Sequence, residues 1–352
     1  MIRFSPVLPL LALSAYPVSG APLVGYNQTN LVSSVPGLAV TTDSNLINPW
    51  GIATTGSSPF WVANQGSSTS TLYNGAGAKQ ALTVNTTGSP TGVVANTNAS
   101  VFNGDIFIFA TLGGTITGWR GALGTNAEVL SLGNGGSYTG LALGSTANGT
   151  YLYAADSKNN QVVVLPSSGS PALSGNFVDP NLPAGFSIYN IQFLAGILYV
   201  TYENETLGGG VVDKFSLNGD FLQRLSANGS GGPLDSPWGL AIAPSNFGPA
   251  SGALLVGNEA NGMINAFDST TGAFLGTLAD PSGNPIINTG LWGLRVGNGG
   301  NGGDPNKLYF AAGINEEQAG LFGAVEFVPE PSTLWMISVG LFLGALTLRR
   351  KA

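Results

Sequence analysis

A short signature recurs six times along this chain and constrains its fold more than any other feature. The clearest copy is Pro-Trp-Gly-Ile-Ala at residues 49–53. The copies begin at residues 49, 90, 138, 188, 237 and 291, a spacing of roughly 40 to 54 residues that is typical of propeller blades. Apolar, β-forming runs follow them at residues 60–63, 106–110, 151–155, 197–202, 253–257 and 308–312. Because a third and, except in the last unit, a fourth strand candidate follow each run, the repeats predict an all-β, six-bladed β-propeller of four-stranded antiparallel blades.

The composition fits one domain built from many short strands. A chain of 352 residues is long enough for two ordinary domains, but a continuous repeat favours one domain whose core is shared between neighbouring sheets. The 53 glycines and the charged content of only 8% are typical of short strands and tight turns. The hydrophobic share of 43% argues against disorder.

Two missing residue types exclude several classes of chemistry. The chain has no cysteine and no histidine, which excludes disulfides, thiol chemistry, histidine-based metal sites and Ser-His or Cys-His catalysis. The net charge of −7 repels the phosphate backbone, so we do not expect nucleic acid as a partner.

The first residues have the pattern of a signal peptide. Arg3 precedes an apolar stretch at residues 7–15, and small residues follow at 18–20. We expect residues 1–20 to direct export, with signal peptidase cutting after Gly20 or Ala21. A buried first strand is the alternative, but the prolines at positions 6, 9 and 17 suit no strand interior.

An apolar strand candidate at residues 29–33 precedes the first repeat and lacks a blade of its own. The last repeat has a second strand at 308–312 and a third at 323–327, but no fourth. Pairing the N-terminal strand with this last unit would close the ring and remove its open sheet edges. We therefore expect the propeller to span residues 21–328, with the N-terminal strand completing the last blade.

The end of the chain changes character after Val328. A Pro-Glu-Pro segment leads into an uncharged, mostly apolar run at residues 334–348, which is followed by basic residues. Fifteen residues are a minimal length for a membrane segment, which the long basic side chains can extend. Basic residues after the run place the C-terminus in the cytoplasm and the propeller outside.

This tail resembles the PEP-CTERM sorting signal of Gram-negative bacteria over residues 329–352. The residues that carry the resemblance are Pro329, Glu330, Pro331, Arg349 and Arg350. The resemblance implies recognition by an exosortase, transient anchoring in the inner membrane, and release or attachment at the cell surface. An ordinary stop-transfer anchor is the alternative.

The body of the chain resembles an uncharacterised family of exported six-bladed propellers, through segments such as Asn-Pro-Trp-Gly-Ile-Ala at 48–53 and Phe-Trp-Val-Ala-Asn at 60–64. The segment at 153–162 is similar to the core of an NHL repeat, in which an Asp-x-x-Asn turn, here Asp156 to Asn159, joins strands two and three. These resemblances imply the fold and bring no activity with them.

Antiparallel blade geometry predicts where a binding site would lie. Residues before strand one and after strand two of each blade fall on the same face of the disk. The side chains that we expect at this mouth of the central channel are Trp50, Asn64, Asp156, Tyr189, Glu203, Trp238, Asn258, Glu259, Trp292 and Asn315.

Three interpretations of this face remain open. Its aromatic rings and polar groups could bind a polar ligand such as a polysaccharide or a surface protein, although the rings could instead pack between blades. Its carboxylate and amide oxygens could hold calcium for a lactonase- or esterase-type hydrolase, although Asn and Asp in turns ordinarily bond to nearby backbone. The propeller could also be a scaffold of the extracellular matrix.

We expect a non-catalytic binding or interaction module that is exported to the cell surface. On this interpretation there are no catalytic residues and no cofactor, and calcium is needed only by the hydrolase alternative. The identity of a metal and of the ligand stays open.

Overall fold

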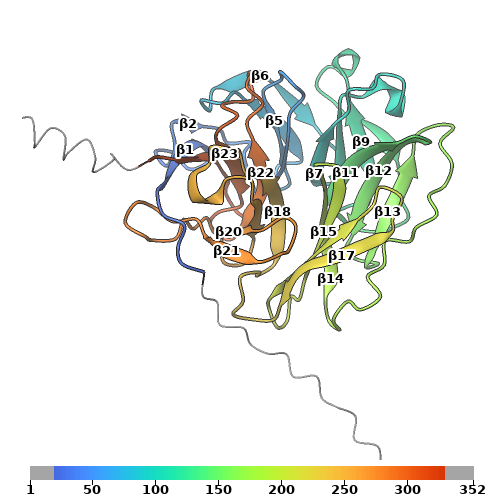
Figure 1. Cartoon of the computed structure of the whole chain (residues 1–352). Helices are drawn as coiled ribbons and strands as arrows, with labels where there is room; N and C mark the ends of the chain where they lie inside the picture. Colours follow the sequence, from blue (N-terminus) through green and yellow to red (C-terminus); the bar gives the residue numbers. More distant parts are fainter. Residues whose placement is uncertain (1–19, 330–352) are drawn as a thin grey trace, which may run out of the picture.

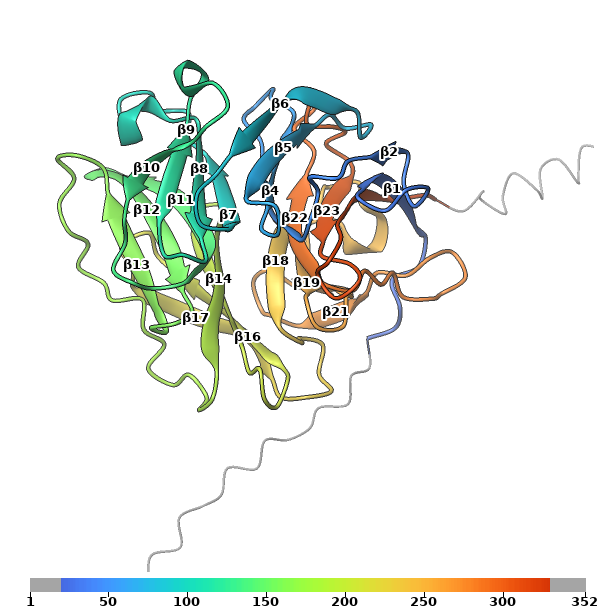
Figure 2. The same cartoon turned by 180° about the vertical axis from the view of Figure 1, so that it is seen from behind.

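The computed structural model describes residues 20–329, which form six β-sheets arranged around a central axis (Figure 1). Their innermost strands are neighbours in the ring order β3, β7, β11, β14, β18, β22 and back to β3. Figure 2 shows the same ring from behind. The prediction of a six-bladed propeller is confirmed.

The strands follow the chain blade by blade. Blades 1 to 3 contain β3 (Pro49–Ala53), β4 (Phe60–Asn64), β5 (Thr69–Tyr73) and β6 (Lys79–Asn85); β7 (Pro90–Ala95), β8 (Phe107–Thr111), β9 (Ile116–Trp119) and β10 (Glu128–Ser131); and β11 (Tyr138–Thr146), β12 (Gly149–Asp156) and β13 (Gln161–Pro166). Blades 4 to 6 contain β14 (Ser187–Leu194), β15 (Ile197–Glu203), β16 (Gly210–Phe215) and β17 (Phe221–Asn228); β18 (Pro237–Ile242), β19 (Leu254–Asn258), β20 (Ile264–Phe267) and β21 (Phe274–Thr277); and β22 (Leu291–Val296), β23 (Leu308–Ala312), β24 (Leu321–Phe327) and β1 (Tyr26–Ser33). Short 3-10 helices lie at Phe102–Gly104, Gly121–Leu123 and Gly248–Ala250.

Blade 3 departs from the expected four strands because it has three. Residues 167–186, which follow β13, contain three prolines and form no strand. Proline cannot donate a ladder hydrogen bond, which explains why this stretch runs as a loop. Phe177 of this loop packs into the buried cluster between blades 3 and 4 and is 7% exposed.

The N-terminal strand closes the ring as predicted. Strand β1 pairs antiparallel with β24, with Tyr26 opposite Phe327, and the two-residue strand β2 (Thr41–Thr42) adds to its outer edge. Figure 1 shows the blue strand β1 beside the orange-red strands of the last blade. The Tyr26 hydroxyl also donates to the Phe247 carbonyl at 2.8 Å, which ties the closing strand to blade 5.

The core lies between neighbouring blades. Six buried apolar clusters each contain the residue that follows the third motif position, which is glycine in five blades and Asn190 in blade 4: Ile52, Val93, Leu141, Ile191, Leu240 and Leu294. This confirms the expectation that these residues point between blades.

The expected signal peptide over residues 1–20 lies outside the described residues except for Gly20, and so does the expected membrane segment at 334–348. Within residues 20–329, no helix is long and apolar enough to cross a membrane.

Candidate functional site

A β-bulge interrupts the innermost strand of every blade at the motif. The pairing register with the second strand shifts within the motif in all six sheets, for example between Pro49 and Ile52 and between Pro237 and Gly239. A bulge re-aims a side chain relative to simple alternation. The motif's second residue therefore points into the central channel in blades 1, 4, 5 and 6, where it is aromatic.

These four aromatic residues form a plug that fills the channel: Trp50, Tyr189, Trp238 and Trp292. Trp50 stacks on Trp292 with ring centroids 3.5 Å apart, and Trp238 packs edge-on against Trp292 at 5.8 Å. The Trp292 indole donates to Asn48 at 3.1 Å, and that of Trp238 to the Thr139 carbonyl at 3.0 Å. The plug is thus anchored by hydrogen bonds to other blades.

Of the two interpretations that the sequence left open for these rings, their burial favours packing over contact with a ligand. They are between 2% and 7% exposed, because they meet at the axis and bury one another. Blades 2 and 3 carry Thr91 and Thr139 at the equivalent position, which leaves room for four large rings.

Three of the predicted polar residues belong to turns. Asn64, Asp156 and Asn258 are fully buried where the second strand ends. The Asp156 carboxylate accepts hydrogen bonds from the Ser137 backbone and from the Asn159 side chain at 2.7 Å, which is the expected Asp-x-x-Asn turn. Asn64 donates to two threonines, and Asn258 to the Pro233 carbonyl at 3.0 Å. Their side chains hold loops and do not face a ligand.

The predicted residues that stay accessible are acidic or amidic and lie around the plug. Glu203 and Glu259 are half-buried at the ends of the second strands of blades 4 and 5, and Asn315 is exposed in blade 6. Glu317, which was not predicted as a site residue, is a neighbour of Glu259 and of Tyr189. Burial raises the pKa of Tyr189 in the plug, and the negative charges of these three glutamates and of Glu205 raise it further. We call Glu203, Glu259 and Glu317 the acidic rim.

The carboxyl groups of the acidic rim have pKa values above the ordinary value for glutamate. Burial raises the pKa of Glu203 to about 7. A hydrogen bond with Ser236 lowers this pKa by a smaller amount, and neighbouring carboxylates such as Glu205 raise it further. Burial also raises the pKa of Glu259 to about 7, helped by Glu317 and Asp235. Close carboxylates that lack basic partners favour protonation. The rim can therefore donate as well as accept hydrogen bonds near neutral pH.

The loop that presents Asn315, Glu316 and Glu317 is strained. These three consecutive residues have φ values of 55°, 54° and 64°, in the left-handed region that non-glycine residues rarely adopt. Strain of this kind clusters at functional sites.

The rim does not form a dedicated metal site. Among residues 20–329, no group of three or more carboxylates is placed to hold a metal ion.

Beyond the plug, the channel opens to the opposite face as a cavity of about 240 Å³. Its polar lining comes from Thr54, Asn190, Gln192 and Arg295, and Trp238 forms part of its inner end. This cavity was not predicted from the sequence. The signal that could have revealed it is the fifth motif position, which is apolar in four blades but Gln192 in blade 4 and Arg295 in blade 6.

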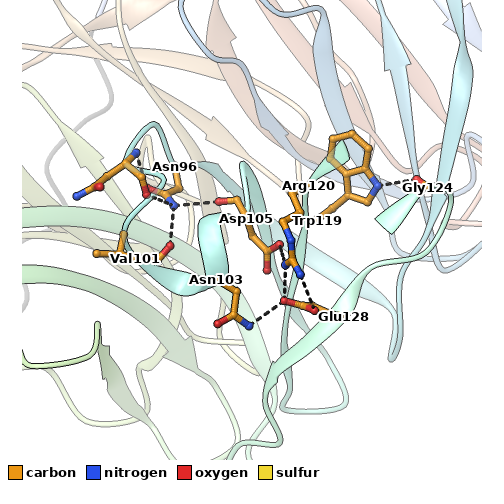
Figure 3. Close-up of polar contacts among 9 residues, drawn as sticks. Asn96, Val101, Asn103, Asp105, Trp119, Arg120, Gly124 and Glu128 are labelled. Carbon is orange, nitrogen blue, oxygen red and sulfur yellow. Dashed lines mark hydrogen bonds and ion pairs between the residues drawn. The ribbon is translucent and has the colours of Figure 1, made fainter. Parts of the chain in front are cut away.

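A cluster of ion pairs lies on the outer part of blade 2. Figure 3 shows Arg120 of blade 2 between Asp105, at 2.7 Å, and Glu128, at 2.6 Å, with Asn103 donating to Glu128. Asp105 is fully buried, so this cluster fixes the outer loops of the blade.

Comparisons with known proteins agree with the fold and the tail. Residues 327–351 match the PEP-CTERM protein-sorting motif, which implies processing by an exosortase and sorting to the surface of Gram-negative bacteria. A streptogramin B lyase structure is similar with a TM-score of 0.53 over 86% of this chain and 98% of that one. At 14% identity this likeness shows the fold alone.

Two relatives in Acanthamoeba polyphaga mimivirus cover most of the chain. The uncharacterized protein R648 is 31% identical over 328 residues, which is 84% of this chain and 78% of that protein. The uncharacterized protein L690 is 28% identical, with 84% of both chains covered. The chain therefore belongs to the family of the uncharacterized protein R648, and it joins a six-bladed β-propeller to a PEP-CTERM sorting motif.

Proposed function

We propose that this protein is an exported cell-surface propeller that acts as a non-catalytic binding module. The observation that carries the proposal is the position of the sorting motif, which starts at residue 327, where the last propeller strand ends. In this proposal residues 1–20 are the signal peptide, residues 21–328 the propeller, and residues 334–348 a membrane segment that holds the chain until an exosortase processes it near Pro329-Glu330-Pro331.

The acidic rim supports binding of a polar ligand, such as a polysaccharide of the cell surface. Its carboxyl groups surround a hydrophobic plug, and hydroxyl groups of a sugar can donate to and accept from such carboxyls. Asn315 adds an exposed amide beside them. Asn64, Asp156 and Asn258 take no part in contact with the ligand, because they are buried in turns.

The sorting step is tested by changing the motif in a Gram-negative host that contains an exosortase. We expect the full chain at the cell surface, and a variant carrying Glu330→Ala and Pro331→Ala to be retained in the membrane fraction. Glu326→Ala, just before the motif, is the matched control and should sort normally. Equal surface amounts of all three proteins would contradict the proposal.

The binding role is tested with the full chain and exopolysaccharide from the same host in a co-sedimentation assay. We expect Glu203→Gln with Glu259→Gln to reduce retention at least tenfold, while Asp220→Asn, which changes an exposed carboxylate on the turn between β16 and β17, keeps it. Retention that does not change in the double variant would remove the rim as the binding surface.

One observation favours the hydrolase as a second candidate. Glu203 and Glu259, with pKa values raised to about 7, could perform acid and base steps without histidine. Against it stands the lack of a three-carboxylate group among the described residues. Calorimetry with calcium and turnover of lactone and ester substrates test it, since an absence of both heat and turnover would end this interpretation.

A further inference from the structure

Arg295 gives the cavity on the opposite face a single positive charge. It lies on β22, the innermost strand of blade 6, and is partly buried. It is one of the residues that line the 240 Å³ cavity. A charged residue on the innermost strand of a propeller is costly unless its charge has a partner.

That partner is missing from the described part of the chain. The two other arginines within residues 20–329 pair with buried carboxylates: Arg120 with Asp105, and Arg224 with Asp179. Arg295 forms no ion pair there and reaches only the carbonyl and the hydroxyl of Thr54, both at the long distance of 3.4 Å from Nη2. Burial lowers the pKa of Arg295, and no carboxylate contributes to the shift. Its Nε and Nη1 groups are left without an acceptor from the described residues.

The remaining walls of the cavity are neutral. The Asn190 amide donates to the Trp238 carbonyl and that of Gln192 to the Leu240 carbonyl, each at 2.7 Å, so both side chains are fixed in place. Val94, Leu143 and Phe193 add apolar surface. The cavity therefore combines one unpaired cation, fixed amides and apolar walls, which is the make-up of a small-molecule site.

We infer that this cavity binds the carboxylate of a small organic acid, with Arg295 as its anchor. The flat guanidinium matches a carboxylate through two parallel hydrogen bonds. One positive charge balances one carboxylate, whereas the net charge of −7 works against entry of a multiply charged anion. The plug separates this cavity from the acidic rim, so the inference is independent of the proposed binding face.

The first test measures binding of sodium glucuronate and acetate to the full chain by calorimetry, with glucose and phosphate as comparison probes. We expect binding of the carboxylates, at least tenfold weaker binding of phosphate, and none of glucose. Arg295→Gln should bind the carboxylates at least tenfold more weakly, and Arg295→Lys should keep part of the affinity. Lys158→Gln removes an exposed positive charge and should change nothing.

A second measurement serves where Arg295→Gln does not fold. Phenylglyoxal modifies accessible arginines, and peptide mass spectrometry reports each site separately. Glucuronate should reduce modification of Arg295 severalfold and leave Arg120 and Arg224 unchanged. Failure of both carboxylates to bind, stronger binding of phosphate, or equal modification of Arg295 with and without glucuronate would overturn the inference.

Discussion

The motif glycines show how a single atom sets the spacing of the blades. A Cβ on Gly51 would lie 2.6 Å from the Thr91 carbonyl oxygen and 2.8 Å from the Val93 nitrogen, both on the innermost strand of the next blade. Contacts this short with backbone force the two strands apart. The glycine is therefore needed for close approach at the axis.

We predict that Gly51→Ala lowers the free energy of unfolding by about 1–3 kcal/mol, the usual cost of overpacking a core. Gly56→Ala is the matched control, because a Cβ there meets nothing within 4 Å. Urea denaturation of both variants checks the difference. A loss in Gly56→Ala as large as in Gly51→Ala would show that close approach is not the reason for the glycine.

The raised pKa values in the acidic rim predict that the free energy of unfolding falls as the pH rises. Glu203 and Glu259 have folded-state pKa values of about 7, above the ordinary value of 4.5. Between these values the folded state binds more protons than the unfolded state, so this stabilisation is complete below pH 4.5 and is lost as the pH rises through 7. Each glutamate contributes on the order of 1 kcal/mol after allowance for its partial exposure.

Thermal unfolding of the full chain between pH 5 and pH 8 measures this effect. We expect the melting temperature to fall across this range, and the fall to be smaller in the variant Glu203→Gln with Glu259→Gln. Asp213 faces Asp179 and Arg224, and burial raises its pKa to about 8. Because the variant keeps Asp213, this residue contributes equally to the pH dependence of the melting temperature in both proteins. An unchanged slope in the variant would contradict the raised pKa values.

The side chains between blades could be predicted from the sequence, whereas those at the axis could not. Ile52 and Leu141 follow the motif glycine at a fixed position, and their burial follows from repeat spacing alone. The orientation of Trp50 and Trp292 depends on the bulge, which shifts the pairing by one residue and leaves no mark in the hydrophobic pattern. The sequence therefore left open whether these rings face a ligand or pack against one another.

At the scale of elements, strand β1 carries the closure of the ring. It pairs with β24 along its length, from Tyr26 opposite Phe327 to Ser33 opposite Leu321. The Tyr26 hydroxyl donates to the Phe247 carbonyl and accepts from the Ala250 nitrogen at 3.0 Å. The missing fourth strand of the last repeat made this pairing predictable, because an unpaired sheet edge needs a partner.

We predict that a chain lacking residues 26–33 loses cooperative unfolding and aggregates, because the edge of β24 is then exposed. Tyr26→Phe, which keeps the strand but removes the buried hydroxyl, should cost only about 1–2 kcal/mol. Circular dichroism melting and light scattering distinguish the two variants. A deletion variant that stays monomeric with a sharp transition would show that the ring does not depend on this strand.

At the scale of the whole molecule, the plug divides the central channel into two regions of opposite character. Glutamates surround one end, and the single cation Arg295 faces the cavity at the other. Repeat spacing predicted that distant loops would meet at one opening, but the sequence could not show that the channel is closed in the middle. Closure depends on how rings from four blades pack together, which is a property of the assembled ring.

Removing one ring tests how far the plug stabilises the whole propeller. Trp292 contacts the other three rings and is 2% exposed, so Trp292→Ala leaves a cavity where four blades meet. We predict a loss of about 3–5 kcal/mol in the free energy of unfolding, the usual cost of truncating a buried aromatic side chain. Trp119→Ala on the outer part of blade 2 is the matched control and should cost less, because Trp119 is only partly buried. Urea denaturation measures both values, and equal losses would mean that the axis contributes no more to stability than the periphery of a blade.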